Sequence, residues 1–289
     1  MSSGFVNLMY GGNIIMEQII YNLQDMTHLN WAKARNSSGT AGSFLKAYEE
    51  TPNGKIYYKL SNYDAFRGII GHECINEIIV DRLLTLLSIE HLPYQLIHAK
   101  IRVDGKSLET WLCASKDFKQ RGETKIALDA YYQAERNQDE SPLDFCLRCG
   151  WEKSIYEMLV VDYLILNRDR HGANMEVLRN RYRKTVRLAP LFDHGLSFFC
   201  RCEDEVALEG EDALADKPVQ CFVGSRSAWN NLHLIPVGKD PELYPLQERD
   251  LIILTDGLDA VIGKKWLDRI LEMIWKRWQA YENFCNQRR

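Results

Sequence analysis

Two short polar segments, and the spacing between them, constrain this chain more than any other feature. The first reads Asn-Arg-Asp-Arg-His-Gly-Ala-Asn at residues 167–174, and the second, 18 residues later, reads Asp-His-Gly at residues 193–195. Asp, Asn and Gly are common in turns, so either segment alone would be weak evidence. Together they supply two carboxylates and one carboxamide, which are hard oxygen ligands suited to Mg²⁺. The pattern therefore predicts that both segments meet at one polar site.

The surrounding sequence supports this prediction. Residues 155–166 carry apolar side chains at helical spacing, with Asp162 expected on the exposed side, and predict a helix that ends directly before the first segment. Residues 175–178 and 186–188 resemble strands and flank the polar run 179–185, which predicts a hairpin. Such a hairpin would return Asp193 to the side of Asn174.

This combination of groups matches the requirements of phosphoryl transfer. One Asp orients the attacking hydroxyl and accepts its proton, while an Asn and a second Asp bind the Mg²⁺ that bridges the nucleotide phosphates. Protein kinases place these groups in His-Arg-Asp-x-x-x-x-Asn and Asp-Phe-Gly, with the same offset from Asp to Asn. We predict Asp169 and His171 as catalytic residues, and Asn174 and Asp193 as metal ligands.

A loop of small residues precedes two strand-like segments. The loop covers residues 36–43, and the strands at 44–48 and 55–60 are joined by an Asn-Gly turn, which is a strong hairpin signal. Backbone N–H groups of such a loop can approach phosphates closely because side chains are small or absent. We therefore predict an ATP-binding loop made of Ser38, Gly39, Thr40, Ala41, Gly42 and Ser43.

A lysine and a glutamate are expected to complete the ATP site. Lys59 comes after the loop, where kinases place the lysine that contacts the α- and β-phosphates. Lys55 lies on the same strand face, so the two-residue period does not separate the two, and we favour Lys59 because of the segment downstream of it. Residues 73–89 form an amphipathic helix whose Glu77 is the favoured partner of the lysine. Glu73 is the alternative and is expected to be a solvated acid in the first turn.

The remaining pattern predicts an α+β fold with two lobes. Residues 94–103 and 108–114 alternate like strands around an Asp-Gly turn, and residues 16–23 are helix-like. Residues 115–121 are expected to start a helical region and to form the hinge. The long apolar and aromatic face of residues 265–284 indicates a core helix. We expect a small N-terminal lobe (1–117), with an antiparallel sheet and one helix, and a larger, mainly helical lobe (118–289).

The length, net charge and composition of the chain disfavour several classes of protein. The chain has 289 residues, a formal net charge of −4 and eight cysteines, with no zinc-finger spacing among the close Cys pairs. The charge disfavours a general nucleic-acid binder. No apolar run is long enough to span a membrane, and no Lys or Arg precedes Lys33, unlike a signal peptide. We expect reduced thiols and a cytoplasmic protein, with delivery to another cell left open.

Two runs of charge have no assigned role. Arg179, Arg181, Arg183, Lys184 and Arg187 cluster around the predicted hairpin, and residues 203–205 and 209–212 are acidic. Each run is most simply a solvated loop. Two alternatives are recognition of a charged partner and docking of one run on the other.

These motifs resemble those of HipA-like kinases. The resemblance rests on Asn-x-Asp-Arg-His-x-x-Asn, on Leu-Ala-Pro-Leu-Phe-Asp-His-Gly at residues 188–195, and on Gly-His-Glu-Cys-Ile-Asn-Glu at residues 71–77. It extends from about residue 36 to the C-terminus and implies a two-lobed kinase fold with ATP- and Mg²⁺-dependent Ser/Thr phosphorylation. It also implies autophosphorylation of the small-residue loop, where Ser37, Ser38, Thr40 and Ser43 are candidates. Longer toxin members carry an extra N-terminal subdomain, and about 35 residues precede the loop here, so the chain resembles the compact members.

The resemblance also sets expectations about partners. We expect a protein substrate and a monomer, with an antitoxin or another regulatory protein as a candidate partner, and no direct contact with nucleic acid or membrane. A small-molecule or lipid phosphotransferase is one alternative. A catalytically weak nucleotide-binding regulator is another, although Asp169, Asn174 and Asp193 are all present.

Overall fold

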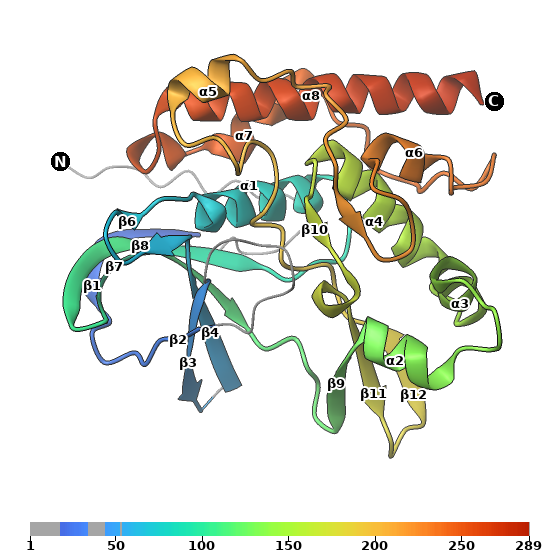
Figure 1. Ribbon diagram of the computed structural model, residues 1–289, viewed down its shortest axis with the longest axis horizontal. Coiled ribbons are helices and arrows are strands. Elements are labelled where there is room, and N and C mark those ends of the chain that lie inside the picture. The colour runs from blue at the N-terminus through green and yellow to red at the C-terminus, as the bar shows by residue number, and fades with distance from the viewer. Residues whose placement is uncertain (1–17, 34–43, 53, 289) are drawn as a thin grey trace.

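The computed structural model describes residues 18–33, 44–52 and 54–288. The predicted ATP-binding loop, residues 38–43, lies outside the described residues, as does Ser37. The protein combines a six-stranded sheet with a larger, mainly helical part (Figure 1). The predicted α+β class is therefore confirmed.

The six-stranded sheet has the strand order β1-β7-β8-β4-β3-β2. Its members are β1 (Ile19–Asp25), β2 (Ala32–Lys33), β3 (Leu45–Thr51), β4 (Gly54–Leu60), β7 (Tyr94–Val103) and β8 (Lys106–Lys116). Both predicted hairpins are present, because β3 pairs with β4 and β7 pairs with β8, each antiparallel. The sheet is mixed rather than purely antiparallel, since β1 pairs with β7 in parallel.

The strand β1 corrects one expectation from sequence. Residues 16–23 were predicted to be helix-like, but residues 19–25 form a strand that pairs with β7, including Ile19 with Leu96 and Asp25 with Lys100. The partner strand lies more than 70 positions further along the chain. Tertiary pairing of this kind overrides a weak local preference.

The helix α1 (Glu73–Leu86) packs against the sheet and follows a small hairpin of β5 (Tyr63–Asp64) and β6 (Gly68–Ile69). Its apolar residues are almost completely buried, as predicted from their spacing. Most of α1 is buried because it also contacts the helical part of the molecule, while Thr85 is exposed and Leu86 is partly buried.

The rest of the chain is mainly helical, with short strands around the site. The helices are α2 (Leu128–Glu135), α3 (Pro142–Arg148), α4 (Glu152–Leu164), α5 (Glu205–Glu209), α6 (Ala228–Leu232), α7 (Leu251–Thr255) and α8 (Lys264–Gln287). The 3-10 turns are η1 (Gly172–Asn174), η2 (Glu248–Asp250) and η3 (Leu258–Ala260). The strands are β9 (Glu123–Ala127), β10 (Asp169–Arg170), β11 (Glu176–Asn180), β12 (Thr185–Leu188) and β13 (Gln220–Cys221).

The segment after β8 differs from the prediction of a helical crossing at residues 115–121. β8 continues to Lys116, residues 117–122 form a connection, and β9 then pairs with β11. Together β9, β11 and β12 form a second, three-stranded sheet, which projects at the lower edge of Figure 1. The expected hairpin of residues 175–188 is thus present, and β9 pairs with it as a third strand.

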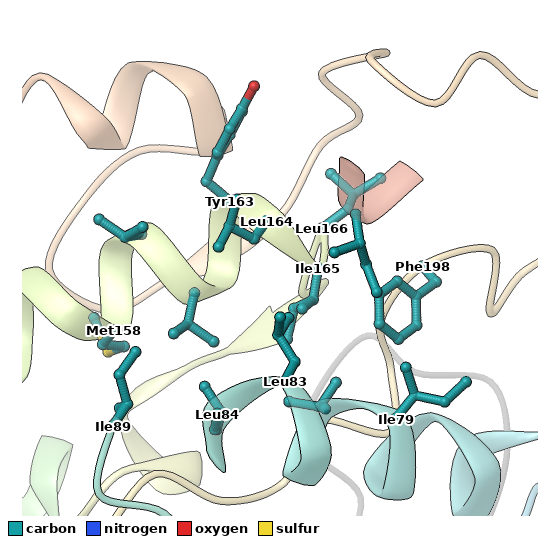
Figure 2. Packing of buried hydrophobic residues seen from close by; sticks show 14 of the residues in the cluster. Ile79, Leu83, Leu84, Ile89, Met158, Tyr163, Leu164, Ile165, Leu166 and Phe198 are labelled. Atoms are coloured by element: carbon teal, nitrogen blue, oxygen red, sulfur yellow. The ribbon is translucent and has the colours of Figure 1, made fainter. Parts of the chain in front are cut away.

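A common apolar core joins α1 to α4. Figure 2 shows Leu83 and Leu84 of α1 facing the end of α4 and the residues that come after it, with Phe198 packed alongside. Leu164, Ile165 and Leu166 are at most 1% exposed. Full burial of such a side chain is worth about 1.5–3 kcal/mol. The chain that enters the predicted catalytic segment therefore starts from a fixed support.

The helix α8 runs along the upper edge of Figure 1 and covers the helical part. Its buried face contains Trp266, Leu267, Ile270, Met273, Ile274 and Trp278, so the prediction of a core helix is confirmed. All eight cysteines are free thiols. Across residues 18–33, 44–52 and 54–288, no helix has the length and apolar character needed to span a bilayer.

Candidate active site

The segment that carries Asp169 is held to the end of α4 by side-chain hydrogen bonds. Asn167 is buried; its Nδ2 donates to Asp162 Oδ1 at 2.9 Å, and its Oδ1 accepts from the backbone N–H of Asp169 at 3.1 Å. Leu166 turns the chain with a positive φ of 49°. These contacts fix the position of the Asp169 backbone relative to the end of α4.

A buried ion pair lies beneath this segment and corrects the expectation that Asp162 is exposed. Asp162 is 8% exposed and Arg170 is 1% exposed, and Arg170 Nε lies 3.0 Å from Asp162 Oδ2. The prediction failed because a carboxylate on an apolar helix was assumed to face water. The partner of Asp162 is Arg170, eight positions later in the chain. The single Asp on such an apolar helix was the feature of the sequence that could have indicated a buried ion pair.

Arg170 also links the two polar segments to each other. Its Nη1 donates to the carbonyl of Asn174 at 3.3 Å and to the carbonyl of Phe192 at 2.9 Å. Phe192 directly precedes Asp193, so one nitrogen atom joins the backbones that carry both predicted metal ligands. In addition, the backbone N–H of Arg168 donates to the carbonyl of Leu196 at 2.9 Å. The structure thus brings the two segments together.

The side chains of Asp169 and Asn174 are in direct contact. Asn174 Nδ2 donates to the carbonyl of Asp169 at 2.8 Å and to its Oδ2 at 3.2 Å. This contact occupies the amide nitrogen and leaves the Asn174 carboxamide oxygen for another ligand. Among the residues that the structure describes, the buried Asp169 Oδ1 has no hydrogen-bond partner.

His171 lies beside that unpartnered oxygen. Its Nδ1 accepts a hydrogen bond from the backbone N–H of Ala173 at 3.2 Å. A neutral imidazole that accepts at Nδ1 carries its proton on Nε2. His171 Nε2 lies 3.6 Å from Asp169 Oδ1, so its N–H is placed near the carboxylate.

Lys59 connects the sheet, α1 and the second polar segment. Its Nζ lies 3.1 Å from Glu77 Oε1 and 2.8 Å from Asp193 Oδ1, and Lys46 Nζ is 3.9 Å from Asp193 Oδ2. Lys55 instead pairs with Glu50 at 3.0 Å. The structure therefore places Lys59, and not Lys55, at the site, with Glu77 as its partner on α1. Lys46 was not identified from the sequence.

Glu77 also holds the backbone that comes after Asp193. It is 2% exposed, and its Oε2 accepts a hydrogen bond from the backbone N–H of His194 at 2.9 Å. Asn76, the preceding residue of α1, donates through Nδ2 to the carbonyl of Gly195 at 2.8 Å. Asp193 itself has a positive φ of 61°, a conformation that Asp tolerates better than most residues. Neither Asn76 nor the Glu77–His194 contact was predicted.

The expectation that Glu73 is a solvated acid is wrong. It is 8% exposed, and its Oε2 accepts from the backbone N–H of Asn62 at 2.9 Å. Burial raises the pKa of this carboxyl. The reason is close packing: a Cβ atom on Gly195 would lie 2.9 Å from the Glu73 Cβ, so the Asp-His-Gly segment passes directly over the start of α1.

The two aspartates have opposite pKa shifts. For Asp193, burial acts to raise the pKa, but the positive charges of Lys59 and Lys46 outweigh it and hold the pKa well below its usual range. For Asp169, burial raises the pKa, and the negative charge of Asp193 adds to this effect. Asp193 is therefore held as a carboxylate, whereas Asp169 is better suited to accept a proton.

The donor set fits Mg²⁺ only in part. Asn174 and Asp193 offer oxygen atoms, which Mg²⁺ prefers, and Asp169 Oδ1 is a further oxygen without a partner in the described structure. Within the described ranges, no group of three or more His, Cys, Asp or Glu side chains is placed to hold a metal ion. Mg²⁺ with a nucleotide is usually coordinated by a few protein oxygens, and phosphate oxygens and water complete its coordination shell.

Comparison with solved structures identifies the fold. The crystal structure of the Helicobacter pylori proinflammatory kinase CtkA matches with a TM-score of 0.64 and 16% sequence identity, and the match covers 88% of this chain and 94% of that one. The chain has the fold of a kinase. The two-lobed, kinase-like architecture expected from the sequence is thus confirmed.

A second match is too distant to support an argument. It is HipA from Shewanella oneidensis MR-1, in a toxin–antitoxin complex with HipB and operator DNA, with a TM-score of 0.38 and 13% identity. The match covers 89% of this chain and 60% of HipA. Comparisons of the sequence with family models and with curated proteins found no significant match.

Proposed function

We propose that this protein is an ATP- and Mg²⁺-dependent protein serine/threonine kinase of the HipA-like type. The observation that carries the proposal is the position of Asp193, which contacts Lys59 and lies beside the Asp169–Asn174 pair. A lysine held by a helix glutamate, a metal-binding Asp and a separate Asp base are the groups that kinases use. We further propose residues 1–117 and 118–289 as the two lobes.

Each residue then has a role in transfer. Lys59, held by Glu77, would contact the α- and β-phosphates of ATP. The small-residue loop 38–43 is the proposed phosphate-binding loop. Asn174 and Asp193 would hold Mg²⁺, which would supply positive charge to neutralise the phosphates. Asp169 orients the acceptor hydroxyl and takes its proton as the oxygen bonds to the γ-phosphorus and the bond to the bridging oxygen of ADP breaks. His171, whose Nε2 lies 3.6 Å from Asp169 Oδ1, would influence the carboxylate by its proximity.

A transfer assay with labelled ATP tests this function against its rivals. We expect the label on protein in the presence of Mg²⁺. Label found only on a small or lipid acceptor would favour another phosphotransferase. ATP binding without any transfer would favour a nucleotide-binding regulator. The antitoxin partner and the monomeric state stay predictions.

The small-residue loop is a proposed site of autophosphorylation, at Ser37, Ser38, Thr40 or Ser43. A phosphate dianion there would compete with the ATP phosphates for the same backbone N–H groups. Intact-mass analysis after incubation with ATP and Mg²⁺ is expected to show added phosphate. An unchanged mass for an enzyme that phosphorylates other proteins would count against this step.

Loss of the Asp193 carboxylate should abolish Mg²⁺-dependent nucleotide binding. We expect Asp193→Ala to lose the rise in melting temperature that ATP with Mg²⁺ gives to the wild type, because a ligand stabilises only a fold that binds it. Asp268→Ala, an exposed acid on α8, is the matched control and should keep the rise. An undiminished shift in Asp193→Ala would contradict the assignment.

The raised pKa of Asp169 predicts a pH dependence. The base must be ionised, so kcat/KM should fall on the acid side at a pH above the ordinary value for Asp. The neighbouring His171 acts to lower the pKa of Asp169. His171→Gln should therefore move the acid limb to still higher pH. A limb that stays in place, or moves to lower pH, in this variant would contradict the effect of His171 on Asp169.

A further inference from the structure

The β11–β12 hairpin and the neighbouring connection form a strongly basic surface. We call it the basic tip and define it by Lys119, Arg121, Arg181, Arg183 and Lys184, all of which are exposed. The pairing of Asn180 with both Glu123 and Thr185 brings the three chain segments together at this end of the second sheet. It lies at the lower edge of the molecule in Figure 1.

The basic tip has no partner within the described part of the chain, since none of its five cations forms an ion pair there. Two acids lie close to the tip, and each pairs with a cation outside it. Glu123 is bound by Arg187 through two hydrogen bonds of 3.0 and 3.1 Å, and Asp117 Oδ1 lies 2.9 Å from Lys125 Nζ. Arg179 points to Glu135, 3.9 Å away. Among the described residues, the five cations of the tip therefore have no ion-pair partner, although Glu123 and Asp117 lie within electrostatic range of Arg183 and Lys119.

The acidic run of residues 203–212 does not neutralise the tip. Its four glutamates pair with other cations: Glu203 with Arg67 at 3.5 Å, Glu205 and Glu209 with Lys265, and Glu211 with Lys217. Its two aspartates, Asp204 and Asp212, accept hydrogen bonds from nearby backbone N–H groups. The alternative in which the two charged runs dock on each other is therefore wrong. The cations of the basic tip therefore stay available to an external partner.

The tip is also held in a defined shape. Asn180 Oδ1 accepts hydrogen bonds from the backbone N–H groups of Tyr182 at 3.1 Å and Arg183 at 3.0 Å, which closes the turn. Tyr182 is 92% exposed and stands between Arg181 and Arg183. A rigid turn loses little conformational entropy on binding, and an exposed tyrosine adds apolar contact area.

We propose that the basic tip binds an acidic polypeptide segment. Three adjacent strands span about 10 Å, so a short extended run of Asp and Glu can reach all of its cations. An acidic peptide is favoured over nucleic acid because the chain as a whole carries a formal net charge of −4, which opposes a long polyanion. This surface is separate from the proposed phosphoryl-transfer groups, and its occupancy can be measured without catalysis.

Fluorescence anisotropy with a labelled Asp/Glu peptide of about eight residues provides the test. The variant Arg181→Gln/Arg183→Gln/Lys184→Gln should bind about tenfold more weakly than wild type, and Lys119→Gln/Arg121→Gln should also bind more weakly. The matched control, Lys100→Gln/Arg102→Gln/Lys106→Gln, removes three exposed cations from the β7–β8 hairpin and should bind as wild type.

Three outcomes would overturn the proposal. The first is absence of peptide binding to the wild type at low salt. The second is equal weakening in the tip and control variants, which would indicate a non-specific effect of charge. The third is tighter binding of a single-stranded oligothymidine of the same length than of the peptide, which would assign the tip to nucleic acid. Unchanged melting temperatures will show that the variants are folded.

Discussion

Replacement of Asp169 by Asn is expected to reduce the rate of phosphate transfer by about 10²–10⁴-fold, because the acceptor hydroxyl would lose its proposed base. Asn has the same shape, and the Asn167 and Arg170 contacts that fix this segment do not involve the Asp169 carboxylate. The fold and the binding of ATP with Mg²⁺ should therefore persist. Single-turnover transfer and nucleotide-dependent thermal shifts, measured on the same preparation, check both parts.

Two comparisons make this result specific. Asp268→Asn changes the same chemical group on the exposed side of α8 and should transfer phosphate at the wild-type rate. A wild-type rate in Asp169→Asn would remove Asp169 from the base role. Loss of nucleotide binding in that variant would instead indicate a structural effect on the neighbouring Asn174.

The site residues that could be predicted from sequence are those that the spacing of residue types within a short segment identifies. The offset from Asp169 to Asn174, and the hairpin length to Asp193, are local features, and the structure places all three together. Lys59 could not be separated from Lys55 by periodicity because both side chains share a strand face. The sheet separates them: Lys59 pairs with Cys113 in the interior and faces Glu77, whereas Lys55 lies near the end of the hairpin.

The errors have a common physical origin in long-range contacts. Asp162 and Glu73 were expected to be solvated, because an acid on a helix is usually exposed. Each is buried because a partner from another segment satisfies it: Arg170 for Asp162 and the backbone of Asn62 for Glu73. The strand β1 was missed for a similar reason, since its partner β7 is distant in sequence. Spacing within a segment carries no information about such partners.

The buried pair of Asp162 and Arg170 gives the second large prediction. Arg170→Met leaves Asp162 buried without its cation, and removal of one member of such a pair costs about 3–5 kcal/mol in the free energy of unfolding. Denaturant unfolding measures this loss directly. Arg67→Met is the control, because its ion pair with Glu203 is mostly exposed and should contribute little.

The double variant Asp162→Leu/Arg170→Met separates stability from positioning. Replacement of both charges by apolar groups of similar volume is often neutral, so much of the lost stability should return. Activity should not return, because the carbonyls of Asn174 and Phe192 still lack the guanidinium that joins them. Recovery of stability and turnover together would show that Arg170 serves the core alone. Recovery of stability without turnover would show that Arg170 holds the two segments with the proposed metal ligands in their relative positions.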